Sequence, residues 1–140
     1  MTLKFSRLNV NAVAPTRKHP TDAGVDIYAS EDVRIPPFAC RVVPTGVTCE
    51  VPEGTLLQAW PKSRHDHLLG AGVIDAGYQG EIKIKVVNYS WKPLRVRRGE
   101  AVAQLVQLPV LCEPLEELPP EEIHRVRSAR DGSGGIHGGE

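Results

Sequence analysis

Apolar and polar residues alternate over many short stretches of the chain, as they do in strands that bury one face. Glycines and prolines, 13 and 12 in number, fall between these stretches and leave no room for a long helix. The stretches that we predict to be strands are residues 3–8, 33–35, 41–43, 46–51, 55–60, 80–88, 94–97 and 101–108. Many short strands with turns between them predict an all-β fold of the sandwich, barrel or jelly-roll type.

The most regular strand pattern covers residues 81–88. Ile82, Ile84 and Val86 alternate here with Lys83 and Lys85, so we expect the apolar side chains to face the core and the lysines to face solvent. Residues 51–55 and 97–100 contain glycine beside proline or charged residues, which is typical of tight turns between strands. These features predict a chain that reverses direction often.

Composition narrows the class of protein. The chain has 140 residues, 41% of them hydrophobic and 24% charged, which is the balance of one globular domain. It contains no apolar run of the roughly 20 residues that a transmembrane helix needs, and no basic segment followed by an apolar run near residue 1. We therefore expect a cytoplasmic protein that does not enter a membrane.

Charge and cysteine content bear on the ligand and the compartment. Lys plus Arg and Asp plus Glu both number 17, which argues against binding to a nucleic acid polymer and leaves a small polyanion open as a ligand. Cys40, Cys49 and Cys112 form an odd set without the close pairs of a zinc site, so we expect free thiols in a reducing compartment.

The amino-acid composition changes twice toward the end of the chain. Residues 113–122 are acidic and contain prolines, which favours an exposed crossing over a core element. Glycine dominates from Arg130 onward, and such a sequence does not bury enough apolar surface to order itself. We predict a β domain over residues 1–127 and a flexible arm over residues 128–140, which is either a frayed terminus or a glycine-rich anion-binding segment.

Three segments combine carboxylates, glycines and polar side chains near predicted strands. They read Asp-Ala-Gly-Val-Asp-Ile-Tyr-Ala at 22–29, Gly-Val-Ile-Asp-Ala-Gly-Tyr-Gln-Gly-Glu-Ile at 72–82 and Gly-Glu-Ala-Val-Ala-Gln-Leu at 99–105. Together with Pro61-Lys62-Ser63 and the glycine-rich arm, they resemble in order and approximate spacing the five motifs of trimeric dUTPases, over about residues 22–139. The resemblance implies a jelly-roll-like β-barrel of the β-clip type with a flexible C-terminal arm.

The resemblance also implies an activity, the hydrolysis of dUTP to dUMP and pyrophosphate. In this family pattern Asp75 is the general base that deprotonates the water attacking the α-phosphorus. Tyr78 packs against the deoxyribose, where a 2′-hydroxyl would clash. From the residues alone, Asp75 in a turn made possible by Gly77 is also consistent with a simple turn cap, and Tyr78 with a side chain that covers the sheet.

The other implied nucleotide-binding positions lie in the second to fifth motifs. They are Lys62, Ser63, Arg64, Leu69, Gly72, Gln104, Arg130, Gly132, Gly134, Gly135 and His137. Ser63 and Gln104 are implied to contact the phosphate chain. Asp26 is implied to position either the metal, through water, or a cationic neighbour near the phosphates. From the residues alone, Asp26 is also consistent with a carboxylate that only shapes a turn. The family implies Mg²⁺ delivered on the nucleotide phosphates and a homotrimer with active sites between subunits.

The second and third motifs depart from the family pattern. Residues 61–64 read Pro-Lys-Ser-Arg where the family has Pro-Arg-Ser-Gly, so a lysine replaces an arginine that binds through a planar fork. The segment between Ser63 and Asp75 is also shorter than in typical members. As a result, Leu69 stands near the position of the asparagine that helps to recognise uracil.

The fifth motif departs as well. Asp131 and Ile136 stand where the family has an arginine before and an aromatic residue after its glycines. Arg130 and His137 lie one residue outward on each side, so a shift of register by one residue restores both roles. If the register is fixed, we expect weaker closure of the arm and a higher KM.

Three alternatives remain beside this interpretation. Residues 65–67, His-Asp-His, follow Ser63, but catalytic triads are assembled from distant segments and no third metal ligand has suitable spacing. dCTP deaminase resembles dUTPase in fold, but its catalytic glutamate matches Lys85, which cannot shuttle a proton as a carboxylate does. A dUTPase-like trimer that binds nucleotide or regulates a partner, with weak catalysis, stays open because the second and fifth motifs are altered.

Overall fold

The computed structural model describes residues 2–62, 68–70 and 72–124, and within these ranges it contains strands and turns but no helix. The all-β prediction is therefore confirmed. The strands are β1 (Lys4–Arg7), β2 (Gly24–Tyr28), β3 (Val33–Ile35), β4 (Cys40–Pro44), β5 (Val47–Glu50), β6 (Thr55–Trp60), β7 (Leu68–Leu69), β8 (Gly72–Asp75), β9 (Lys83–Val87), β10 (Leu94–Val96) and β11 (Ala101–Pro109).

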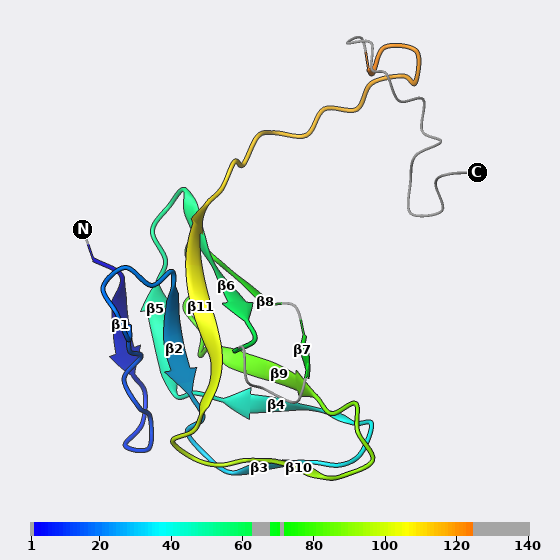
Figure 1. Ribbon diagram of the computed structural model, residues 1–140. Coiled ribbons are helices and arrows are strands. Elements are labelled where there is room, and N and C mark those ends of the chain that lie inside the picture. Colours follow the sequence, from blue (N-terminus) through cyan, green and yellow to red (C-terminus); the bar gives the residue numbers. More distant parts are fainter. Residues whose placement is uncertain (1, 63–67, 71, 125–140) are drawn as a thin grey trace.

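These strands pair antiparallel into small sheets around one core (Figure 1). The largest sheet has the strand order β2-β11-β6-β8, and its long central strand β11 pairs with β2 on one side and β6 on the other. The β4-β9-β7 sheet runs across the foot of these strands. The two-stranded β1-β5 ribbon lies at one side, and the two-stranded β3-β10 ribbon lies below the β4-β9-β7 sheet in this view. The outer face of the largest sheet carries exposed side chains, among them Trp60, Val73 and Leu108.

Strand alternation builds the core as the sequence predicts. Ile82, Ile84 and Val86 are buried, whereas Lys83 and Lys85 between them are exposed. The strand itself begins at Lys83 and not at residue 80, because the Ile82 amide donates to the Val47 carbonyl of β5 at 2.8 Å instead of joining the β9 ladder. The residues before β9 are thereby free to form a loop.

The strands β2, β7 and β8 were not among the segments with a strand pattern. Aspartate and glycine in β2 and β8 have low strand propensity and are more typical of turns. Pairing of β2 with β11 and of β8 with β6 overrides that local preference, since each strand gains backbone hydrogen-bond partners along one edge. Tertiary pairing, and not local pattern, makes these motif segments extended.

Both predicted tight turns are confirmed. Gly54 and Gly99 each adopt a φ of 83°, a left-handed conformation that side chains with a Cβ rarely enter. The Thr55 amide donates to the Pro52 carbonyl at 3.1 Å, and the Glu100 amide to the Arg97 carbonyl at 3.0 Å. These bonds close the turns before β6 and β11.

Cys40, Cys49 and Cys112 are all free thiols, and only Cys49 is buried. Residues 111–124 are exposed and extend away from the strands beyond the end of β11 (Figure 1), as predicted for residues 113–122. The predicted arm, residues 128–140, lies outside the described residues, so its boundary stays a prediction. Within the described ranges, no helix has the length and apolarity needed to cross a membrane.

Candidate active site

One group of predicted site residues gathers where β2, β11 and the end of β6 meet. Asp26 of β2 lies opposite Gln104 of β11, and Gln104 lies opposite Trp60 of β6. Lys62 follows β6, and its Nζ lies 2.5 Å from Asp26 Oδ1 in an ion pair whose side chains are 32% and 19% exposed. Gln104 Nε2 donates to the Pro61 carbonyl at 3.1 Å. We call Asp26, Lys62 and Gln104 the polar cluster.

Gly24 makes room for this cluster. A Cβ built on Gly24 would lie 2.1 Å from Gln104 Oε1, so any larger residue would displace the amide. The two residues are diagonal neighbours on paired strands, since Gly24 lies opposite Val106 and Gln104 opposite Asp26, but they are far apart in the sequence. No sequence signal marks Gly24 for this role, because the requirement arises only from the pairing of β2 with β11.

A second group surrounds the turn after β8. Asp75 is the last residue of β8, and it lies opposite Leu56 of β6. Gly77 adopts a φ of 85°, and the Tyr78 amide donates to the Asp75 carbonyl at 3.1 Å. No atom lies within 4 Å of a Cβ built at Gly77, so the backbone conformation and not space requires glycine. The predicted turn at Asp75 is confirmed, and it leaves the carboxylate exposed.

The Tyr78 ring folds back over the loop that follows this turn. Its hydroxyl donates to the Glu81 carbonyl at 2.8 Å. A Cβ on Gly80 would lie 2.5 Å from the Tyr78 hydroxyl oxygen, so the ring occupies the space that a side chain at residue 80 would need. The orientation of Tyr78 therefore depends on the backbone at residues 80 and 81.

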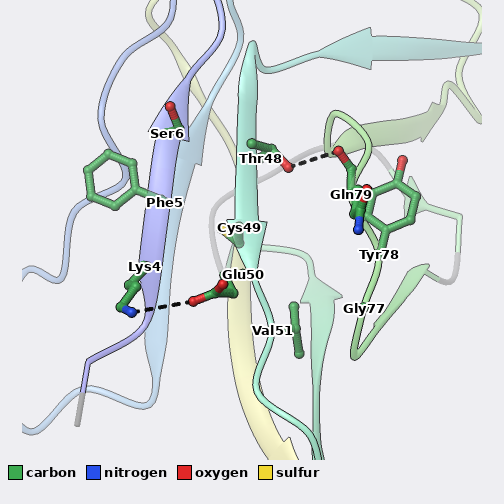
Figure 2. A pocket seen from close by; sticks show the side chains of 10 residues that line it. All are labelled: Lys4, Phe5, Ser6, Thr48, Cys49, Glu50, Val51, Gly77, Tyr78 and Gln79. Carbon is green, nitrogen blue, oxygen red and sulfur yellow. Dashed lines mark hydrogen bonds and ion pairs between the residues drawn. The ribbon is translucent and has the colours of Figure 1, made fainter.

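A cleft of about 540 Å³ opens beside this loop, between it and the β1-β5 ribbon (Figure 2). Phe5, Glu50 and Tyr78 are among the residues that line it. Cys49 lines it too, but burial raises the pKa of this thiol above its ordinary value. Cys49 is therefore a protonated thiol at neutral pH, and the cleft has no thiolate nucleophile from it.

The two groups lie on the same outer face of the largest sheet. Directly paired residues share a face, as do residues an even number apart on one strand, and this links Gln104 through Trp60 and Leu56 to Asp75. Leu56 and Trp60 are separated by about 13 Å along β6, at roughly 3.3 Å per residue. Within one protomer, Asp75 is thus well separated from the polar cluster.

The remaining predicted residues are placed differently. Leu69 lies on β7 opposite Val86, and its side chain packs against the core. Gly72 lies on β8 opposite Ala59. The other predicted positions, Ser63, Arg64, Arg130, Gly132, Gly134, Gly135 and His137, lie outside the described residues, as do residues 65–67.

The carboxylate of Asp26 suits a metal ion whose other ligands are mainly water and substrate oxygens. Among residues 2–62, 68–70 and 72–124, no three His, Cys, Asp or Glu side chains come together as a metal-binding group. Asp26 is already paired with Lys62. A carboxylate in this position fits an indirect contact to Mg²⁺, which commonly keeps several of its waters.

Fold and site together define an all-β protein with an exposed carboxylate at a glycine turn and a cationic, amide-bearing cluster on one sheet face. A family model described as dUTPase matches residues 10–138. The chain belongs to the dUTPase family, and the resemblance drawn from its motifs is confirmed.

Individual relatives agree with this assignment. The deoxyuridine 5′-triphosphate nucleotidohydrolase of Gloeothece citriformis is 36% identical over 142 residues, covering 97% of this chain and 94% of the relative. The structure of Staphylococcus bacteriophage 80alpha dUTPase with dUpNHpp is similar with a TM-score of 0.87 at 28% identity, covering 98% of each chain. The dUTPase of phage phi11 of S. aureus, with a structural Mg(II) ion, gives a TM-score of 0.80 at 27% identity and covers 84% of this chain and 97% of the phage chain.

Proposed function

We propose that the protein hydrolyses dUTP to dUMP and pyrophosphate. The observation that carries this proposal is the presence, on one sheet face, of an exposed carboxylate at a glycine turn and of the polar cluster. Membership of the dUTPase family and the dUpNHpp complex of the phage relative support the same substrate. Lys85, at the position of the deaminase glutamate, lies exposed on β9 and does not favour deamination.

In the proposed reaction Asp75 accepts a proton from a water molecule as its oxygen forms a bond to the α-phosphorus. The bond from the α-phosphorus to the oxygen that bridges to the β-phosphorus breaks, and pyrophosphate takes that oxygen away. The turn at Gly77 holds the carboxylate at the end of β8, where water has access to it. Tyr78 lies against the deoxyribose and excludes a 2′-hydroxyl by shape.

The polar cluster would bind the phosphate chain. Asp26 holds the Lys62 ammonium in place, and Gln104 adds an amide at the same end of the sheet. We assign Ser63 and Arg64 to the same chain of phosphates, and Arg130, Gly132, Gly134, Gly135 and His137 to the arm that closes over it. Mg²⁺, when bound with the nucleotide, neutralises phosphate charge, and Asp26 would contact it through water.

Base recognition would differ from that of typical members. The Leu69 side chain packs against the core and has no hydrogen-bonding group. Leu69 and Gly72 would therefore contact uracil through their backbone atoms. This assignment follows from the absence of polar side-chain atoms at both residues.

A homotrimer with active sites between subunits fits the arrangement of the two groups. A base acting through one water reaches about two hydrogen bonds, roughly 6 Å, which is less than the separation between Asp75 and the polar cluster along β6. The same face exposes Trp60, Val73 and Leu108 by 44%, 55% and 36%, and apolar residues gathered on one face suit a subunit contact. We therefore propose that Asp75 of one subunit acts on phosphates bound by the polar cluster of another.

The proposal is tested by measuring pyrophosphate release from dUTP, dCTP, dTTP and UTP, with and without Mg²⁺. Rapid release from dUTP alone, dependent on Mg²⁺, is the expected result. Ammonia from dCTP would contradict it in favour of deamination. Tight binding of dUTP without pyrophosphate release would instead support a nucleotide-binding or regulatory trimer.

We also propose that the protein is cytoplasmic, because its cysteines are free thiols, as is usual in a reducing compartment.

Removal of the arm, residues 130–140, is expected to lower kcat/KM for dUTP at least about tenfold, because an arm that closes over substrate excludes water and completes the site. The melting temperature is expected to change little, since a sequence so rich in glycine has too little apolar surface to contribute to a core. Steady-state kinetics and thermal denaturation of the shortened chain measure both effects. A large fall in melting temperature would mean that the arm is a structural element.

Gly24→Ala is expected to lower kcat/KM for dUTP about tenfold while leaving stability nearly unchanged. The added methyl group displaces Gln104 Oε1, which is the end of a flexible side chain and moves at small cost to folding. The displaced amide no longer reaches a charged phosphate, and such a hydrogen bond contributes about 1.5–3 kcal/mol.

A double-mutant cycle with Gln104→Ala checks this mechanism. If Gly24→Ala acts through Gln104, it causes no further loss of activity in the Gln104→Ala background. An additive loss would show that Gly24 affects the site by another route.

A further inference from the structure

The loop between β8 and β9 carries Tyr78 and is fixed at both ends. At its start, the Tyr78 amide closes the turn onto the Asp75 carbonyl. At its end, the Thr45 hydroxyl donates to the Ile82 carbonyl at 2.6 Å, and the Ile82 amide donates to the Val47 carbonyl at 2.8 Å. Residues 76–80 lie between these two attachments and belong to no strand.

Thr48 of β5 holds the middle of this loop. Its hydroxyl donates to the Gly80 carbonyl at 2.8 Å and lies 3.5 Å from the Gln79 carbonyl oxygen. Figure 2 shows the Thr48 side chain directed from β5 across the cleft edge to Gln79, beside the Tyr78 ring. In the part of the chain that the structure describes, no other group from outside residues 75–82 hydrogen-bonds to residues 76–80.

Thr48 and Tyr78 bind neighbouring carbonyls of the same backbone segment, those of Gly80 and Glu81. The Tyr78 hydroxyl donates to the Glu81 carbonyl, and the ring fills the space beside Gly80. A movement of the Gly80 carbonyl away from β5 would therefore carry the ring with it. Asp75 is held separately, by the pairing of β8 with β6.

We infer that Thr48 is a positioning residue for sugar selection. Through the Gly80 carbonyl it fixes the Tyr78 ring, and the ring in that position leaves no space for a 2′-hydroxyl. The inference rests on the proposed hydrolysis of dUTP and on the role of Tyr78 in it. It adds a residue from β5, outside the motif segments, that decides between deoxyribose and ribose.

Thr48→Val tests the inference, because valine keeps the shape of the side chain and removes the hydroxyl. The expected result is a fall of about fivefold in the ratio of kcat/KM for dUTP to kcat/KM for UTP, the size that one neutral hydrogen bond supplies. The loss on dUTP should arise in KM, with kcat little changed, because Asp75 keeps its position. Thr48→Ser retains the hydroxyl and should keep the ratio of the unmodified protein.

Thr55→Val is the matched control. The Thr55 hydroxyl also donates to a backbone carbonyl at 2.8 Å, that of Pro52, in the turn before β6 and not in the loop that carries Tyr78. This variant should keep the ratio of the two substrates. If the unmodified protein does not hydrolyse dUTP, the proposed function itself fails. If it does, an unchanged ratio in Thr48→Val, or an equal loss on both substrates with a lower melting temperature, overturns the positioning role.

Discussion

Asp75→Asn is expected to lower kcat for dUTP by at least about 100-fold, the contribution that a positioned general base typically makes. Asparagine has the same shape as aspartate but does not accept the proton of the attacking water. The exposed Asp75 side chain at the end of β8 is not buried in the core, so we expect the fold to be retained. Single-turnover kinetics at saturating dUTP, with thermal denaturation of the same samples, measure both properties.

Glu31→Gln is a suitable control for this variant. Glu31 is also an exposed carboxylate, but it lies between β2 and β3 and away from the turn at Gly77. The control should retain the activity of the unmodified protein. Near-normal turnover in Asp75→Asn would contradict the assignment of the general base, whatever the binding affinity for dUTP.

Asn88→Ala is expected to lower the free energy of unfolding by about 3 kcal/mol, because several buried backbone groups lose their partner at once. Asn88 is only 2% exposed. Its Nδ2 donates to the carbonyls of Ile35, Pro36 and Lys92 at 3.2, 3.2 and 2.7 Å, and its Oδ1 accepts from the amide and hydroxyl of Ser90. The side chain thus ties the residue after β9 to the end of β3 and to the loop before β10.

Urea unfolding at a fixed protein concentration measures this loss, since the stability of the proposed homotrimer would depend on concentration. Ser90→Ala is the matched variant. It removes the hydroxyl bonds but leaves the three Asn88 donations in place, so we expect a loss of about 1 kcal/mol. If Asn88→Ala costs no more than Ser90→Ala, the buried network does not stabilise the fold as we infer.

Several features of the site could be predicted because they are local. The run Ile74-Asp75-Ala76-Gly77-Tyr78 specifies a turn through one glycine, and the structure has that turn with a positive φ at Gly77. The motifs likewise predicted that Lys62 supplies a positive charge and Gln104 an amide group at the site. The ion pair of Lys62 with Asp26 was anticipated only as a cationic neighbour of unnamed identity.

Other features could not be predicted. The contact of Gly24 with Gln104 exists because β2 pairs with β11. The bond from Thr48 to Gly80 exists because β5 passes the loop before β9. No sequence pattern indicated that the Leu69 side chain packs against the core. This packing leaves only the Leu69 backbone to contact a ligand.

The sequence by itself determined the all-β class, the inward side of β9, the turns at Gly54, Gly77 and Gly99, and the family. These follow from alternation with a period of two, from the conformational freedom of glycine and from short motifs, all of which act between near neighbours. Only the tertiary structure decided that β2 and β8 are strands and that Asp26, Lys62 and Gln104 meet. It also decided that Asp75 stands apart from them on the same face. Strand pairing joins residues that are distant in sequence, and local propensity does not specify the partner.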